Sequence, residues 1–306
     1  MTRAQPNRPV ALIEAVHVDV VAHLRLAGFF RWLAARATGW VRSPRGAVVL
    51  LLWLSGATSA LFVNDTACLL LAPLALETAR GLRRDPVPFL LAIAMGANLG
   101  SVATVVGNPQ NMLVASFSGI GYTRFAAVLA PVALVGLAVA SLLLPWQFRA
   151  ALTGPAPPRV SPAEEPLDRR LLTKSLVITG LLLVALLVGV TPSLAALLAA
   201  SALLITRRVD PQDVYAQIDW SLLTMFAGLF VVVAGIEQAG LTQRGLELIG
   251  PGARHSLPAF TGVVVGLSNL VSNVPAVLVL KAWAVRFVPA ERAWLVLAMA
   301  STLAGN

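Results

Sequence analysis

The sequence is poor in charged residues. Only 12% of its 306 residues are charged, against 58% that are hydrophobic, and the mean hydropathy is +0.80. Soluble domains are about half apolar, so a soluble globular class is excluded. The uncharged segments 125–146, 175–206 and 220–236 reach or approach the ~20 apolar residues that a membrane-spanning helix needs. We therefore expect an integral membrane protein.

Cysteine is nearly absent, and so are clusters of catalytic side chains. The single cysteine, Cys68, lies in an apolar segment, so an internal disulfide is excluded. A membrane-embedded enzyme needs His and Glu metal ligands, a Ser/His pair or clustered aspartates, whereas the one aspartate within the apolar segments is the isolated Asp65. We expect neither enzymatic activity nor a cofactor.

Positive charge is abundant but confined to loops. The net charge is +9, yet the arginines lie beside apolar segments and not on one amphipathic face, which disfavours a nucleic-acid partner. Segment 47–79 is preceded by Arg31, Arg36, Arg42 and Arg45 and followed by Arg80, Arg83 and Arg84. The positive-inside rule then places both ends of this segment in the cytoplasm. We expect a multi-pass protein of a bacterial-type plasma or inner membrane.

Segment 47–79 is too long for a plain spanning helix. It is interrupted by Val63-Asn64-Asp65-Thr66, whose polar groups are costly in hydrocarbon. A re-entrant hairpin that turns at Asn64-Asp65 near mid-depth would return both ends to one side of the membrane. A single bent spanning helix with a buried asparagine is the alternative.

A second interruption follows the apolar segment 89–106. The pentapeptide Gly107-Asn108-Pro109-Gln110-Asn111 should unwind a helix, because Pro109 has no amide hydrogen and Gly107 tolerates unusual dihedrals. The three side-chain amides could replace lost backbone partners or coordinate an ion. Unwound backbone at membrane depth must be buried or line a cavity. The alternative is a turn outside the membrane between two helices.

The chain divides into two halves at a polar, proline-rich linker over residues 150–170. The first half covers 1–149, with the hairpin at 47–79 and a broken helix around 107–111. The second covers 171–306, where 272–276 matches 63–67, 297–300 matches 91–94, and a hairpin is expected at about 257–289. Chance similarity among Leu-, Ala- and Val-rich helices is the alternative. The predicted fold is an all-α polytopic membrane transporter with inverted repeats, re-entrant hairpins and broken helices.

At these residues the chain resembles the ion transporter superfamily of divalent-anion:sodium symporters, citrate permeases, arsenite permeases and sodium/proton antiporters. The symporters carry a Ser-Asn-Thr motif at each hairpin tip, followed by a Gly-Ser-Pro-Pro-Asn-like break in the next helix. Asn64 at the first tip, Ser272-Asn273 at the second and the break 107–111 match this pattern. The resemblance implies a coupling sodium ion held by side-chain and backbone oxygens, with Asn64, Asn108 and Asn111 as its side-chain ligands.

The first tip departs from the symporter pattern. Val63 and Asp65 stand where the motif has Ser and Thr, so the dicarboxylate contacts of those two positions do not carry over. A carboxylate at mid-membrane costs about 3 kcal/mol or more, so Asp65 is expected to be protonated, paired with a cation, or both. Asp65 is therefore the candidate proton or cation site. A structural, hydrogen-bonded aspartate at a helix N-terminus is the alternative.

These features predict a secondary active transporter of a small, anionic solute, a carboxylate or an oxyanion, coupled to sodium or protons. Arsenite efflux and sodium/proton antiport are alternatives within the superfamily. A non-transporting truncated fragment is another, because the repeat places the second break just beyond Asn306. The expected partners are the solute or ion and the lipid bilayer, with a homodimer left open. The predicted site residues are Asn64, Asp65, Thr66, Gly107, Asn108, Pro109, Gln110, Asn111, Ser272 and Asn273.

Overall fold

The computed structural model describes residues 23, 24, 26–29, 32, 43–153, 168–204, 220–241, 244 and 256–305. These residues form α-helices, one 3-10 helix and no strand, which confirms the all-α class. The elements are α3 (Pro44–Leu61), α4 (Asn64–Gly81), α5 (Val87–Ser101), η1 (Val105–Gly107), α6 (Pro109–Ser118), α7 (Tyr122–Gln147), α8 (Arg169–Leu187), α9 (Pro192–Leu204), α11 (Trp220–Gln238), α13 (Leu257–Val271), α14 (Asn273–Ala284) and α15 (Ala290–Leu303).

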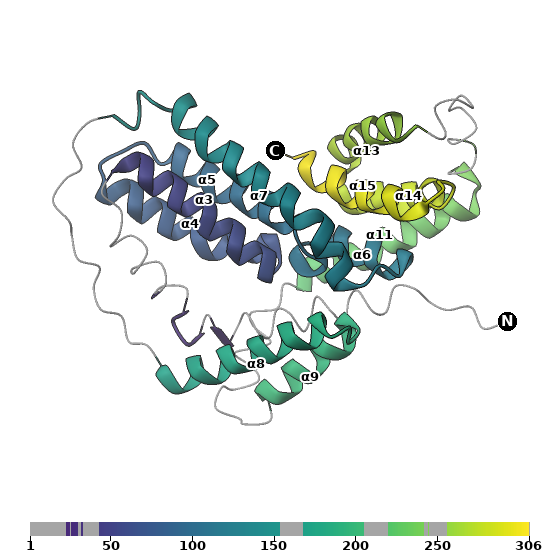
Figure 1. The fold of residues 1–306 in the computed structure, drawn as a ribbon, viewed down its shortest axis with the longest axis horizontal. Helices are drawn as coiled ribbons and strands as arrows, with labels where there is room; N and C mark the ends of the chain where they lie inside the picture. Colours follow the sequence, from purple (N-terminus) through teal and green to yellow (C-terminus); the bar gives the residue numbers. More distant parts are fainter. Residues whose placement is uncertain are drawn as a thin grey trace.

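Helices α3, α4, α5 and α7 pack together as a first group (Figure 1). α3 lies against α5 with its backbone almost in contact, because a Cβ at Gly100 would overlap the carbonyl oxygen of Gly56. The Ser55 hydroxyl donates a hydrogen bond of 2.7 Å to the Ile93 carbonyl across the same contact. Small residues and a hydroxyl that bonds between helices are typical of helix pairs in membranes.

Helices α13, α14 and α15 form a second group (Figure 1), in which aromatic rings meet between α13 and α14. Phe260 of α13 stacks edge-on against Trp283 of α14, with ring centroids 5.0 Å apart. Phe287, just after α14, lies 5.2 Å from the Phe260 ring. Such aromatic pairs add about 0.5–1.5 kcal/mol beyond the area that they bury.

Helix α6 belongs to the first half by sequence but packs on α14 and α15 of the second group. Figure 1 shows it between the two groups, with α11 beside α14. α5 also contacts α15. The two halves are thus joined through the helix that follows the break.

Helices α8 and α9 form a separate pair that contacts the rest through α7. Asp168 caps α8, because its Oδ1 accepts hydrogen bonds of 3.0 Å from the backbone N–H groups of Arg170 and Leu171. α8 therefore begins at Arg169, so the last two residues of the predicted linker, 169 and 170, are helical. Residues 154–167, the middle of that linker, lie outside the described residues.

Three of the described helices, α3, α7 and α8, are long and apolar enough to cross a membrane. α13 and α14 have 15 and 12 residues. At about 1.5 Å per residue they span roughly 22 and 18 Å, less than the ~30 Å hydrocarbon core of a bilayer. These lengths suit a hairpin that enters the membrane and leaves it on the same side. α3 has the length of a span, so the depth of the first tip stays a prediction.

Candidate functional site

The first hairpin places a helix start at its tip. α3 is joined to α4 by the buried pair Phe62 and Val63, and α4 begins at Asn64. Asp65 is exposed in the first turn of α4, while Asn64 and Thr66 are half-buried. The tip therefore combines the positive end of the α4 dipole with three polar side chains.

The side chain of Asn64 has a buried oxygen with no evident partner. Its Oδ1 accepts no hydrogen bond from any described residue. A buried acceptor left unpaired costs about 1–3 kcal/mol. Because native proteins leave few such groups unpaired, the position calls for a physical explanation such as a bound ion or water.

The break in the next helix begins before the predicted pentapeptide. α5 ends at Ser101, a 3-10 turn covers Val105–Gly107, and α6 begins at Pro109. Proline suits the first position of a helix, where its missing N–H would have no intrahelical partner anyway. Gln110 and Asn111, which we expected in unwound backbone, therefore form the first turn of α6.

Asn108 and Gly107 shape the break. The Asn108 Oδ1 accepts a hydrogen bond of 2.9 Å from the backbone N–H of Asn111 and so caps α6. A Cβ at Gly107 would overlap the carbonyl oxygen of Ser101, so this close backbone approach requires glycine. The side chains of Asn108, Gln110 and Asn111 are all buried at this turn.

The amide nitrogen of Asn111 donates two hydrogen bonds, whereas its oxygen receives none from the described residues. Nδ2 donates to the carbonyl oxygens of Ser101 at 3.0 Å and Thr104 at 2.9 Å. The buried Oδ1 accepts no hydrogen bond within the described chain. Asn64 and Asn111 are therefore alike in carrying a buried amide oxygen to which no described helix donates a hydrogen bond.

Thr104 links the break to the first hairpin. Its hydroxyl donates a hydrogen bond of 2.6 Å to the carbonyl of Ala60, in the last turn of α3. The buried tip residues Phe62 and Val63 share one apolar cluster with Val105 of the break. Tip and break thus form one region, although about 40 residues separate them in the chain.

Thr302 of α15 is a site residue that the sequence analysis missed. Its Oγ1 accepts hydrogen bonds from Asn108 Nδ2 at 3.1 Å and Gln110 Nε2 at 3.2 Å, and donates to the Ala298 carbonyl at 2.8 Å. Asn108 and Thr302 are 194 residues apart in the chain and both fully buried. The available signal was the pair of hydroxyls, Ser301 and Thr302, in an otherwise apolar segment.

The second hairpin has a similar tip. Ser272 is exposed with a φ of +83°, and the half-buried Asn273 begins α14, as Asn64 begins α4. Neither residue takes part in the hydrogen bonds that hold Asn108 and Asn111. The second hairpin reaches the break through α14 and α15, which pack on α6.

Comparison with known proteins agrees with this architecture. Residues 19–304 match the profile of the citrate transporter family, CitMHS. The chain belongs to this family. Family membership confirms the resemblance to the ion transporter superfamily and makes the chain an integral membrane transporter with an all-α polytopic fold.

Proteins similar to this member of the citrate transporter family have names that refer to different functions. It is 30% identical to the silicon efflux transporter LSI3 of Oryza sativa, over 94% of this chain and 73% of that protein. An uncharacterized transporter of Mycobacterium tuberculosis is 29% identical over 94% and 72% of the two chains. The arsenical pump membrane protein of Escherichia coli is 27% identical over 89% and 67%.

The described part of the chain holds no cluster of side chains that could bind a transition metal. No group of three or more His, Cys, Asp and Glu side chains that could hold a metal ion occurs among those residues. The polar groups gathered at the break are amides, hydroxyls and backbone carbonyls. Neutral oxygens of this kind are ligands for hard cations, whereas zinc takes His, Cys and carboxylate ligands.

Proposed function

We propose that this transporter is a secondary active carrier that moves a small anionic solute, a carboxylate or an oxyanion, coupled to sodium or protons. The proposal rests mainly on one observation. A buried amide cluster at a helix break joins both halves of the chain, and two buried amide oxygens, Asn111 Oδ1 at the break and Asn64 Oδ1 at the hairpin tip linked to it, accept no hydrogen bond from the described residues. A carrier needs a polar site between halves that move relative to one another.

A cation would supply the missing partner for these oxygens. Amide and backbone carbonyl oxygens coordinate hard cations, and a coupling sodium ion needs no carboxylate cluster. The oxygen of Asn108 is already used to cap α6, but a carbonyl oxygen has two lone pairs and can still accept a second contact. Asn64, Asn108 and Asn111 are therefore the proposed side-chain ligands, and the exposed Asp65 is the proposed proton or second cation site.

The helix starts favour an anionic solute. α4, α6 and α14 begin at Asn64, Pro109 and Asn273, and the positive end of each helix dipole favours negative charge. The name of the family refers to citrate, and one relative is named for arsenicals. Both names support a small carboxylate or oxyanion as the cargo.

Two alternatives have some support. Efflux of an arsenical is favoured by the 27% identity to the arsenical pump membrane protein. Sodium/proton antiport is favoured by Asp65, a carboxylate at the first hairpin tip. Both use the same region, so a panel of solutes and gradients separates them.

The test is sodium-dependent thermal stabilisation of the purified chain in detergent, with wild type compared with Asn64→Ala. The variant removes an oxygen that no described residue bonds, so its melting temperature without sodium should be close to that of wild type. A ligand at 100 times its Kd stabilises by about 2.7 kcal/mol. We expect sodium, but not choline, to give such a shift in wild type and little in Asn64→Ala.

Asn269→Ala is the matched control, because Asn269 is an exposed asparagine of α13 that donates only to its own helix at 3.0 Å. It should keep the sodium shift. The same three proteins are then placed in liposomes, and uptake of citrate, arsenate and arsenite is measured with sodium or proton gradients of either direction. Sodium stabilisation that survives in Asn64→Ala contradicts the cation site. The absence of any gradient-driven flux in folded wild type contradicts the carrier function.

A further inference from the structure

A groove on the first helix group lies apart from the proposed transport site. It has a volume of about 590 Å³ and runs between α3 and α7, lined by Arg45, Val49, Trp53, Ser141 and Pro145 among others. None of the residues that line it belongs to the hairpin tip or to the break, and its nearer end, at Trp53, precedes Ala60 by seven residues, which is roughly 10 Å along a helix. The groove is therefore not an opening of the amide cluster and needs an explanation of its own.

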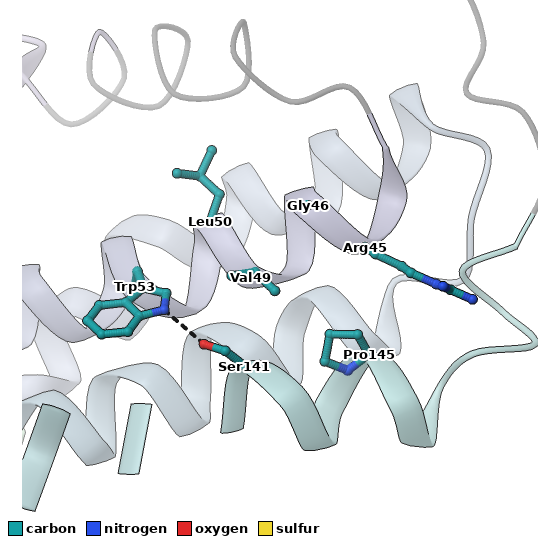
Figure 2. Close-up of a pocket in the computed structure, with 7 residues that line it drawn as sticks. All are labelled: Arg45, Gly46, Val49, Leu50, Trp53, Ser141 and Pro145. Carbon is teal, nitrogen blue, oxygen red and sulfur yellow. Dashed lines mark hydrogen bonds between the residues drawn. The ribbon is translucent and has the colours of Figure 1, made fainter. Parts of the chain in front are cut away.

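The groove is mostly apolar, with polar groups at two places. Figure 2 shows the Trp53 indole turned toward Ser141, to whose hydroxyl its Nε1 donates at 2.8 Å. The Ser141 hydroxyl in turn donates to the Leu137 carbonyl at 2.7 Å, so these polar atoms are satisfied within the protein. Val49 and Pro145 leave only apolar surface along the rest of this wall. The middle of the groove thus offers little to a polar solute.

Arg45 provides the charge at the end of the groove. Its side chain is exposed and extends past Pro145 in Figure 2, and no described acidic residue lies within ion-pair distance of it. A long apolar groove that ends at a cation is complementary to a molecule with an apolar tail and an anionic head.

The surroundings of the groove are those of a membrane interface. The outer face of α7 next to Ser141 is apolar and exposed, with Leu142 75% and Trp146 67% accessible. Tryptophan and arginine are enriched where a helix leaves the hydrocarbon. The basic residues at this end of the group are Arg45, Arg80, Arg83, Arg84 and Arg149, against the acidic Glu77 and Asp85. The groove therefore opens toward a positively charged rim, next to a surface that faces lipid tails.

We propose that this groove binds an anionic phospholipid of the bilayer. One acyl chain lies between α3 and α7 against Val49 and Trp53, and the phosphate contacts Arg45. The bound lipid bridges two helices of the first group, so it stabilises that group against separation of α3 from α7. This inference does not depend on the transported solute, because the groove and the amide cluster are separate.

The experiment measures how strongly phosphatidylglycerol with brominated acyl chains quenches the tryptophan fluorescence of the full chain in detergent micelles. The signal of Trp53 is the difference between wild type and Trp53→Phe. Brominated phosphatidylcholine is the neutral comparison. We expect phosphatidylglycerol to quench Trp53 at lower concentration, and Arg45→Gln to raise the half-quenching concentration about fivefold, from ~1 kcal/mol per basic residue near a lipid surface.

Arg80→Gln is the matched control, since it removes one exposed charge from the same end but outside the groove. The half-quenching concentration for Trp53 in this variant should stay within about twofold of the wild-type value. The proposal is overturned if both arginine variants weaken quenching equally, or if phosphatidylcholine quenches Trp53 as well as phosphatidylglycerol. It is also overturned if native mass spectrometry shows a dimer in which Trp53 is not quenched, because a second copy would then cover the groove.

Discussion

The two hairpins share a plan and differ in how they are packed. Each consists of two helices joined by a very short turn, with an asparagine at the start of the second helix and a third helix packed against both. In the first, α3 and α5 touch backbone to backbone at Gly56 and Gly100. In the second, the rings of Phe260 and Trp283 fill the space between helices.

This difference predicts different sensitivities. Backbone contact through glycine has no adjustable side chain, whereas a ring contact depends on volume and can be partly repacked. Added Cβ atoms at Gly262 and Gly266 of α13 would meet nothing within 4 Å, unlike those at Gly96 and Gly100 of α5. Two hairpins with the same sequence plan therefore need opposite residue sizes at their helix contacts.

The largest expected effect is the loss of the ring cluster in the second hairpin. Trp283 is 1% exposed and packs against Phe260 and Phe287. Trp283→Ala should lower the free energy of unfolding by about 3–5 kcal/mol because it leaves a large cavity. Denaturant titration in detergent measures this, with the exposed Trp220→Ala as control. A loss below about 1 kcal/mol would mean that this cluster does not hold the hairpin.

Next is the glycine contact of the first hairpin. Gly100→Ala forces α3 and α5 apart, so we expect a loss of about 3 kcal/mol or more, at the upper end for overpacking. Gly262→Ala, on an open face of α13, should be neutral or stabilising by up to about 1 kcal/mol. The same titration compares the two. Equal effects would remove the distinction between the hairpins.

A smaller effect is expected where the two halves meet. Thr302→Val keeps the shape of the side chain but removes the acceptor for Asn108 and Gln110. The free energy of unfolding should therefore fall by about 1–3 kcal/mol. Thr302→Ser, which keeps the hydroxyl, should recover most of it. Ser301→Ala, next to it on α15, removes only a contact within the helix. The thermal melt and solute flux of all three variants are compared, and a Thr302→Val protein that behaves like Ser301→Ala would contradict the bridge.

The smallest effect is expected at the surface link between the halves. Arg124 of α7 pairs with Glu291 of α15 at 2.8 Å, but the Arg124 side chain is 66% exposed and that of Glu291 40%. Exposed pairs contribute about 0–1 kcal/mol, less in high salt. A double-mutant cycle of Arg124→Ala and Glu291→Ala, in low and high salt, measures the coupling. A coupling well above 1 kcal/mol would place this pair among the main links between the groups.

Much of the local structure could be predicted from the sequence. Polar residues inside apolar segments marked both hairpin tips, and the helices on either side of them begin or end within a few residues of Asn64 and Ser272. The break was expected at 107–111 and lies at 102–108, because Pro109 starts a helix as readily as it stops one. Propensity at a proline does not tell which side of it is helical.

The sequence by itself determined the class of protein, its helices and the position of their interruptions. These depend on apolar run length, glycine, proline and capping side chains, which act over a few residues. Only the tertiary structure decided that α6 leaves its own half to pack on α14 and α15, and that Asn108 and Gln110 bond to Thr302. Partners separated by 194 residues are chosen by how whole helices pack, and no local pattern records that choice.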